Sequence, residues 1–260
     1  MTVRQTLAAG WGLRRVWWYT ATARTRARYA RTVFGSLWLG LSNLLSIAVL
    51  ALVYGTVFKV QDFNQYVVYL GLGLVVWNAI AAAISAAPNL FEHNAHHLHN
   101  TNINPIFYTL EEWAFQVQTF GQSFALVLLV LSVFQPTLIA NLLLMSWLPL
   151  INLLLFLYWL PLLLCLVGAR YRDLYQLVPI MLQLVFLLSP ILYEQKNLGS
   201  LAWTAELNPL YQVLNPLRQC LIQAQPPGWR DLVLLLANGV GLWLAIRLLN
   251  RERRALPFLI

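Results

Sequence analysis

Charged side chains are scarce in this 260-residue sequence, in which 10% of the residues are charged and 60% are hydrophobic. A soluble domain is about half apolar and a quarter charged, so this composition excludes an ordinary soluble protein. The alternating segments of about ten residues that are typical of a transmembrane β-barrel are also absent. With a mean hydropathy of +0.64, the sequence predicts an all-α integral membrane protein.

Motifs for ATP hydrolysis, metal binding and nucleophilic catalysis are missing too. The sequence has no P-loop, HExxH, CxxC or GxSxG pattern, which excludes ATP binding through a Walker motif. Its two cysteines, Cys165 and Cys220, belong to different predicted segments, and we interpret them as packing residues without a disulfide. A cleavable signal peptide is not expected, because Met1 to Thr22 lacks a short apolar core with a cleavage site. We therefore predict no catalytic residue, metal or cofactor on this chain.

Acidic residues are few, since nine Asp and Glu stand against 17 Lys and Arg, for a net charge of +8. In a soluble protein this excess could indicate nucleic acid, but here most basic residues flank apolar segments. Membrane orientation and contact with anionic membrane lipids explain them better, and no nucleic-acid partner is expected.

Long uncharged segments predict six membrane spans, because about 20 apolar helical residues cross a bilayer core. The spans cover residues 36–58, 66–88, 113–134, 138–167, 174–192 and 232–249. Pro149 and Pro161 are expected to kink the fourth span. With the N-terminus inside, 13 of the 17 Lys and Arg residues fall on the inner side and 4 on the outer. This bias predicts that both termini are cytoplasmic.

Two connecting segments are expected to have structure of their own. Residues 5–31 mix tryptophans with arginines, which predicts an amphipathic helix along the cytoplasmic interface. The outer segment, residues 193–230, contains Asn-Pro-Leu steps at Asn208 and Asn215 that would divide a helix into short pieces. We expect a re-entrant pair of short helices before the last span, packed against protein or lining a cavity. A surface hairpin is the alternative.

Apart from Arg247 near the inner end of the last one, the predicted spans contain no Asp, Glu, Lys or Arg. Proton-coupled transporters usually need such a residue as a relay, so its absence favours a transporter that is powered by another chain.

Several short motifs follow one another along the chain. The first is RYARTVFGSLWLGLS at residues 28–42, followed by a span that ends in VYGTVF at residues 53–58. The others are NPIFY (104–108), ARYRD (169–173), SPILY (189–193), NPL (208–210) and the tail RERRALPFLI (251–260). In this order the motifs resemble the permease subunits of ABC type-2 polysaccharide exporters over nearly the whole chain, and residues 1–260 are expected to form a single transmembrane domain. One bundle of six helices is too narrow to enclose a hydrated sugar chain, whereas two copies could form a channel at their interface.

This resemblance implies a homodimeric permease in the bacterial inner membrane that is not itself an enzyme. Two copies of a cytoplasmic ATPase chain would bind ATP and Mg²⁺, and the substrate would be a lipid-linked O-antigen, capsule or teichoic acid chain. One alternative is an ABC type-2 permease for a drug or another lipid. A second alternative is a membrane glycosyltransferase or acyltransferase that uses Glu92, Glu111, Glu112 and nearby histidines.

Aromatic side chains are candidates for the sugar path, because aromatic faces stack on the C–H faces of sugars. Tyr66, Tyr69, Gly73 and Trp77 recur every three or four residues and form one stripe of the second span. The alternative is a belt of interfacial aromatics, as in any membrane protein. The candidate path residues are Trp38, Tyr54, Phe58, Tyr66, Tyr69 and Trp77.

Two further sites are expected on the cytoplasmic side. Arg28 and Arg31 could contact the pyrophosphate of a lipid-linked substrate, although the positive-inside rule alone also explains them.

The loop at residues 91–105 is the expected contact with the ATPase. Its polar candidates are Glu92, His93, His96, His97 and His99. If the loop is helical, His93, His96 and His97 share a face. Their contact with the ATPase could then depend on pH, and a metal site is the less favoured alternative.

Overall fold

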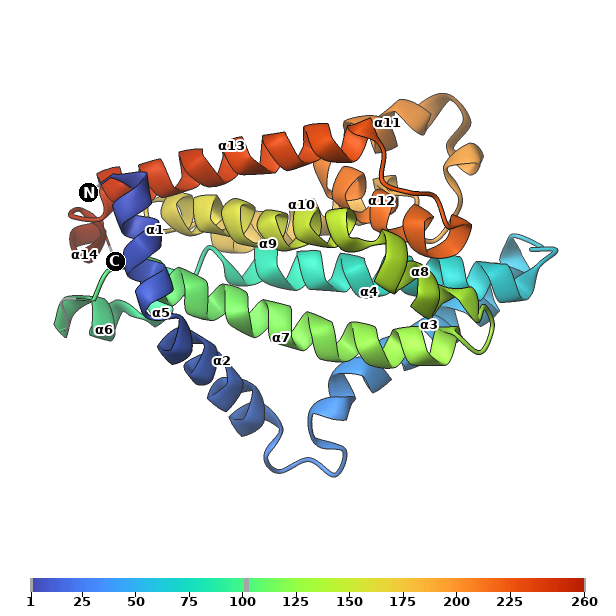
Figure 1. The fold of residues 1–260 in the computed structure, drawn as a ribbon, viewed down its shortest axis with the longest axis horizontal. Coiled ribbons are helices and arrows are strands. Elements are labelled where there is room, and N and C mark those ends of the chain that lie inside the picture. The colour runs from blue at the N-terminus through green and yellow to red at the C-terminus, as the bar shows by residue number, and fades with distance from the viewer. Residues whose placement is uncertain (1, 101–102, 260) are drawn as a thin grey trace.

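The computed structural model describes residues 2–100 and 103–259, and within these residues it is helical, without a β-strand (Figure 1). Five helices are long and apolar enough to cross a membrane: α3 (Trp38–Val57), α4 (Phe63–Ala86), α7 (Ile106–Leu131), α9 (Trp147–Gly168) and α13 (Trp229–Glu252). A sixth apolar helix, α10 (Leu174–Leu188), has 15 residues. At about 1.5 Å per residue it is shorter than the hydrocarbon core, so the fifth predicted span, residues 174–192, remains a prediction.

Helix α4 occupies the centre of the bundle and packs against α3, α7, α9 and α10. Most of its side chains are buried, in contrast to α3 and α13, whose apolar windows are 17% and 22% buried. Gly71 lets Leu131 of α7 come close, since an added Cβ would lie 2.9 Å from a Leu131 methyl carbon. Small residues at such contacts allow membrane helices to approach closely.

The fourth predicted span, residues 138–167, is not one helix. It is divided at Ser146 into α8 (Thr137–Met145) and α9. Pro149 explains the break, because proline has no N–H to donate to the Met145 carbonyl and its ring would clash with that oxygen. The predicted kink at Pro149 is therefore a full break, whereas Pro161 lies inside a continuous α9.

Other predicted boundaries also shift. Helix α7 begins at Ile106, about two turns before the predicted residue 113, and so includes Glu111 and Glu112. A 3₁₀ turn, η1 (Gly35–Leu37), precedes α3. The predicted interfacial helix 5–31 is two helices, α1 (Val3–Gly12) and α2 (Arg14–Tyr29), that meet at Leu13.

The outer segment before α13 contains η2 (Gln195–Leu201), α11 (Ala202–Leu207) and α12 (Pro209–Gln223). Asn208 caps α12 by accepting a hydrogen bond from the Leu210 N–H at 3.0 Å. The predicted break at the second Asn-Pro-Leu step is wrong, because Pro216 lies inside α12. One side of α12 is buried against α4, α8 and α9, so it is not a surface hairpin.

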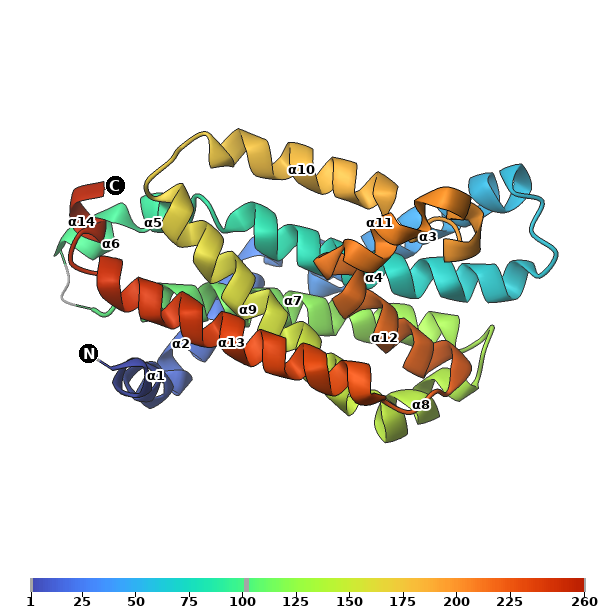
Figure 2. The ribbon, with the colours of Figure 1, turned by 90° about the horizontal axis from the view of Figure 1, so that it is seen from above.

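The two ends of the bundle differ. One end contains both chain termini together with three short helices, α5 (Leu90–His93), α6 (Ala95–Asn100) and α14 (Leu256–Leu259) (Figure 2). The opposite end contains the α3–α4 connection, α8, α11 and α12 (Figure 1). We refer to these as the terminal end and the cavity end of the bundle.

Candidate functional site

A cavity of about 760 Å³ lies at the cavity end of the bundle. Its walls come from the α3–α4 connection, the first two turns of α4, the segment after α10 and one side of α12. These parts are far apart in the sequence, so the site exists only when α12 packs across the start of α4.

Two tyrosines of α4 form one wall and hold the segment after α10 in place. The Tyr66 hydroxyl donates to the Leu192 carbonyl at 2.7 Å. The Tyr69 hydroxyl lies 2.9 Å from the Pro190 carbonyl and 3.1 Å from the Tyr193 carbonyl. Because both hydroxyls bind backbone, these rings stay fixed and leave part of their surface to the cavity.

Arg218 of α12 is the principal charged group in this wall, and it is 3% exposed. Its guanidinium donates to the Pro190 carbonyl at 3.1 Å, to the Tyr211 hydroxyl at 3.2 Å and to Asn215 Oδ1 at 2.9 Å. It also lies 3.8 Å from the centroid of the Tyr69 ring. No ion pair between described residues includes Arg218, so carbonyl dipoles and a ring face replace a counter-ion.

Arg218 was missed by the sequence reasoning, which counted it only as one of four basic residues on the outer side. The signal that could have found it is its spacing, because Tyr211, Asn215 and Arg218 recur at helical intervals on one face of α12. Burial raises the pKa of the Tyr211 phenol, and the neighbouring Arg218 charge opposes this rise. The phenol therefore stays protonated beside the guanidinium at neutral pH.

The remaining lining is rich in side-chain amides, each of which can donate and accept hydrogen bonds. The amide residues are Gln61, Gln65, Gln195, Asn197, Asn215, Gln219 and Gln223. Asp62 and Glu194 add two carboxylates to the lining. Amides beside aromatic faces suit a ligand with many hydroxyl groups, whereas a purely apolar ligand would leave them unpaired.

The six predicted path residues do not form one surface within this chain. Phe58, Tyr66 and Tyr69 line the cavity, and Tyr54 stacks on Phe58 with ring centroids 5.6 Å apart. Trp38 lies toward the other end of α3, where it is 36% exposed.

Trp77 requires a correction, because it is 5% exposed and packs on Phe186 of α10 with ring centroids 5.4 Å apart. Helix α4 is buried on several sides, so Trp77 packs against α10, whereas Tyr66 and Tyr69 at the start of the helix line the cavity.

A second polar feature lies on the exposed side of α3 and α4, away from the cavity. Ser42 and Ser46 of α3 and Asn78 and Ser85 of α4 are all exposed within membrane-length helices. The Asn78 amide donates to Asn43 Oδ1 at 2.6 Å, which ties the two helices together. The Ser42 and Ser46 hydroxyls donate to carbonyls of their own helix, at 3.2 and 2.9 Å, but they still present polar surface that is usual beside water. We call these four exposed residues the polar stripe.

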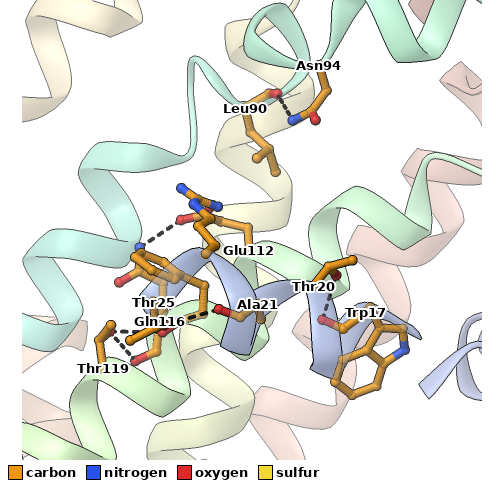
Figure 3. A network of polar contacts seen from close by, with 11 residues as sticks. Trp17, Thr20, Ala21, Thr25, Leu90, Asn94, Glu112, Gln116 and Thr119 are labelled. Carbon is orange, nitrogen blue, oxygen red and sulfur yellow. Dashed lines mark hydrogen bonds and ion pairs between the residues drawn. The ribbon is translucent and has the colours of Figure 1, made fainter. Parts of the chain in front are cut away.

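Glu112, a candidate acid in the enzyme alternative, has a structural contact instead. It is 7% exposed and forms an ion pair with Arg24 of α2 at 2.6 Å. Gln116 donates to its other oxygen at 2.8 Å, one turn further along α7, and Figure 3 shows both side chains beside α2. The Arg24 guanidinium also lies 4.2 Å from the centroid of the Phe115 ring. This cluster fastens α2 to α7 and leaves Glu112 no open position beside a substrate.

Arg28 and Arg31 are both exposed, at the last turn of α2 and in the link to η1. The Arg28 guanidinium lies 5.8 Å from the centroid of the adjacent Tyr29 ring. Their proposed contact with a pyrophosphate therefore stays a prediction, compatible with their exposure.

The expected ATPase contact lies at the terminal end of the bundle. Phe91 of α5 and Leu98 of α6 are buried and anchor these helices. The five candidate residues, Glu92, His93, His96, His97 and His99, are all exposed. Glu92 pairs with Arg172 at 3.5 Å. The chain turns at Asn94 between the helices, so His93 and His96 do not share one helix, and no metal-binding group of three occurs among the described residues.

Comparison with known families identifies the class of this arrangement. A family model described as ABC-2 type transporter matches residues 18–222. The match begins in α2 and ends in α12, so it includes the polar stripe, the α5–α6 segment and the cavity lining except Gln223. A search of curated proteins finds no match.

Proposed function

Because the chain belongs to the ABC-2 type transporter family, we propose that it is the permease subunit that exports a lipid-linked cell-surface polysaccharide. The exported chain leaves the cytoplasm across a bacterial inner membrane, and both termini of the permease lie in the cytoplasm. In this orientation the terminal end of the bundle is cytoplasmic and the cavity lies on the outer side. Helix α10 completes the six spans, and α11 and α12 form the re-entrant pair.

The polar stripe is the observation that supports a conduit most directly. Ser42 and Ser46 are one turn apart on α3, and Trp38 lies one turn before them on the same face. A single chain leaves this face open, so we propose that two copies of the chain enclose a water-filled path along it. Tyr54 and Phe58 continue α3 toward the outer cavity.

The cavity lining supports a saccharide in preference to a drug. Its amide side chains can exchange hydrogen bonds with sugar hydroxyls, and its tyrosine and phenylalanine rings offer stacking surfaces. An apolar drug would leave these amides without hydrogen-bond partners. The enzyme alternative loses support because Glu112 and Glu92 are engaged in ion pairs.

Energy for transport has to come from a partner, because the sequence has no Walker motif. Members of this family normally pair with an ATPase subunit. We propose that two ATPase copies dock on the exposed polar residues of α5 and α6, whose buried residues Phe91 and Leu98 transmit motion to the bundle.

Substitution in the polar stripe tests this proposal. In a cell that displays the glycan, Ser42→Leu/Ser46→Leu should abolish surface display while the permease level and its co-purification with the ATPase are unchanged. Ser200→Leu, an exposed serine of η2 outside the spans, is the matched control and should export normally. Normal display by the double variant would remove the stripe from the path.

A further inference from the structure

A second, shallower pocket lies at the terminal end of the bundle, where α1 meets the last turns of α13. Its volume is about 400 Å³, and it is lined by Thr2, Val3, Trp243, Arg247, Asn250 and Arg251. It is separate from the outer cavity and from the polar stripe, and none of its residues has a role in the proposed export path.

Two arginines give the pocket its charge. Arg247 and Arg251 are one turn apart on α13, both are exposed, and both line the pocket. Arg247 lies 5.0 Å from the centroid of the Trp243 ring, and Arg251 has a loose contact of 3.9 Å with Glu252. Like charges one turn apart repel each other, so an anion between them is stabilising. Guanidinium groups match the geometry of phosphate oxygens.

Asn250 adds a hydrogen-bonding group between the two arginines. The Thr6 hydroxyl of α1 lies 2.7 Å from Asn250 Oδ1, and it also lies 3.2 Å from the Thr2 carbonyl, which holds the Asn250 side chain against α1. The Nδ2 atom is buried and has no hydrogen-bond partner among the described residues. A buried unpaired donor is unfavourable by about 1 to 3 kcal/mol, so turning this amide toward an acceptor oxygen in the pocket would be stabilising. The N-terminal end of α1, the positive end of its dipole, forms the opposite wall.

An exposed apolar strip leads from the pocket along the spanning helix. Leu236, Val240 and Trp243 precede Arg247 at helical intervals, and they are 71%, 58% and 46% exposed. A ligand that fits both parts has an anionic head and a long apolar tail. Trp243 is placed at their boundary, where tryptophan is typical of the membrane interface.

We propose that this pocket binds the phosphate group of an anionic phospholipid, whose acyl chains lie along the exposed face of α13. The site fastens α1 and the end of α13 to the leaflet on the terminal side of the bundle. It is independent of the exported substrate and holds whether or not that substrate is a polysaccharide.

Native mass spectrometry of the detergent-purified chain tests the site, with phosphatidylglycerol as the probe and phosphatidylcholine as the neutral comparison. We expect one retained phosphatidylglycerol per chain and at least about tenfold weaker binding in Arg247→Gln/Arg251→Gln, since a tenfold change is the loss of one good charge-assisted contact. Thr6→Val, which frees Asn250 without changing the charge, should also weaken binding.

The control is Arg15→Gln/Arg26→Gln, which removes the same charge from exposed positions of α2 and should bind phosphatidylglycerol like the original chain. Equal loss in the control, or no loss in the pocket variants, would overturn the site. Displacement of the lipid by an equal concentration of inorganic pyrophosphate would show that a free phosphate compound is the ligand, and would also overturn the assignment to a phospholipid.

Discussion

Replacing Arg218 by Met should loosen the wall of the outer cavity without unfolding the membrane bundle. Met approximates the length of the arginine stem but cannot donate to Pro190, Tyr211 or Asn215. The Pro190 carbonyl keeps its bond from Tyr69, and the Tyr211 hydroxyl can rotate to another partner. The main losses are the Asn215 contact and the guanidinium stacked at 3.8 Å on Tyr69.

These losses set the expected size of the effect. A buried hydrogen-bonding group left without its partner is unfavourable by about 1 to 3 kcal/mol. A desolvated cation–π contact adds about 1 to 2 kcal/mol, and removing a buried charge offsets part of the sum. We expect α12 and the segment after α10 to open about 2 to 3 kcal/mol more easily, which corresponds to roughly 30- to 150-fold faster amide exchange.

Hydrogen exchange followed by mass spectrometry measures this change peptide by peptide. Peptides from 189–193 and 209–223 should exchange faster in the Arg218→Met protein, while peptides from α7 and α9 stay unchanged. Arg230→Met, at an exposed arginine near the start of α13, is the matched control and should behave like the original protein. Uniform exchange in all three proteins would refute the role of Arg218 in holding this wall.

Three further outcomes follow from other contacts. Gly168→Ala should lower the thermal midpoint of the purified protein, because the new Cβ would lie 2.6 Å from Pro88 backbone atoms and overpacking typically destabilises by about 1 to 3 kcal/mol. Gly239→Ala is the control and should not lower the midpoint, since its Cβ would have nothing within 4 Å. Equal midpoints in the two variants would contradict this packing. Arg24→Met should destabilise the folded protein by about 2 kcal/mol, because it leaves the Glu112 carboxylate buried with Gln116 as its remaining contact. Thermal unfolding measures this change, and an unchanged midpoint would show that the ion pair does not fasten α2. Replacing His93, His96, His97 and His99 by Gln should leave the metal content unchanged, and stoichiometric zinc that disappears in this variant would contradict the interpretation of the loop.

Composition and uncharged runs were enough to predict the class of the protein and the positions of five long helices. These features depend on the local balance of apolar and charged residues, which is readable in a single sequence. The break at Ser146 follows from a local rule as well, since Pro149 cannot continue a helix from α8. The prediction erred there because membrane helices often tolerate proline inside a span, as α9 does at Pro161.

The cavity could not be predicted, because its walls come from residues 58–69 and 194–223 that meet only in the folded chain. Arg218 reads as an ordinary outer charge until α12 places it against Tyr69. The periodicity of α4 correctly groups Tyr66 and Tyr69 with Trp77 but does not say which neighbour that face meets. For that reason Trp77 was assigned to a path, although it packs against Phe186.

We propose that the polar stripe of α3 and α4 borders a water-filled path, and thiol labelling can detect that water. In a Cys165→Ala/Cys220→Ala background, Asn78→Cys and Leu236→Cys are each reacted with a charged, membrane-impermeant methanethiosulfonate while the transporter and its ATPase turn over ATP. Both positions are exposed in the single chain, but only position 78 is expected to meet water. Rapid labelling at position 78 with none at position 236 is the predicted result. Equally slow labelling at both positions would contradict the path.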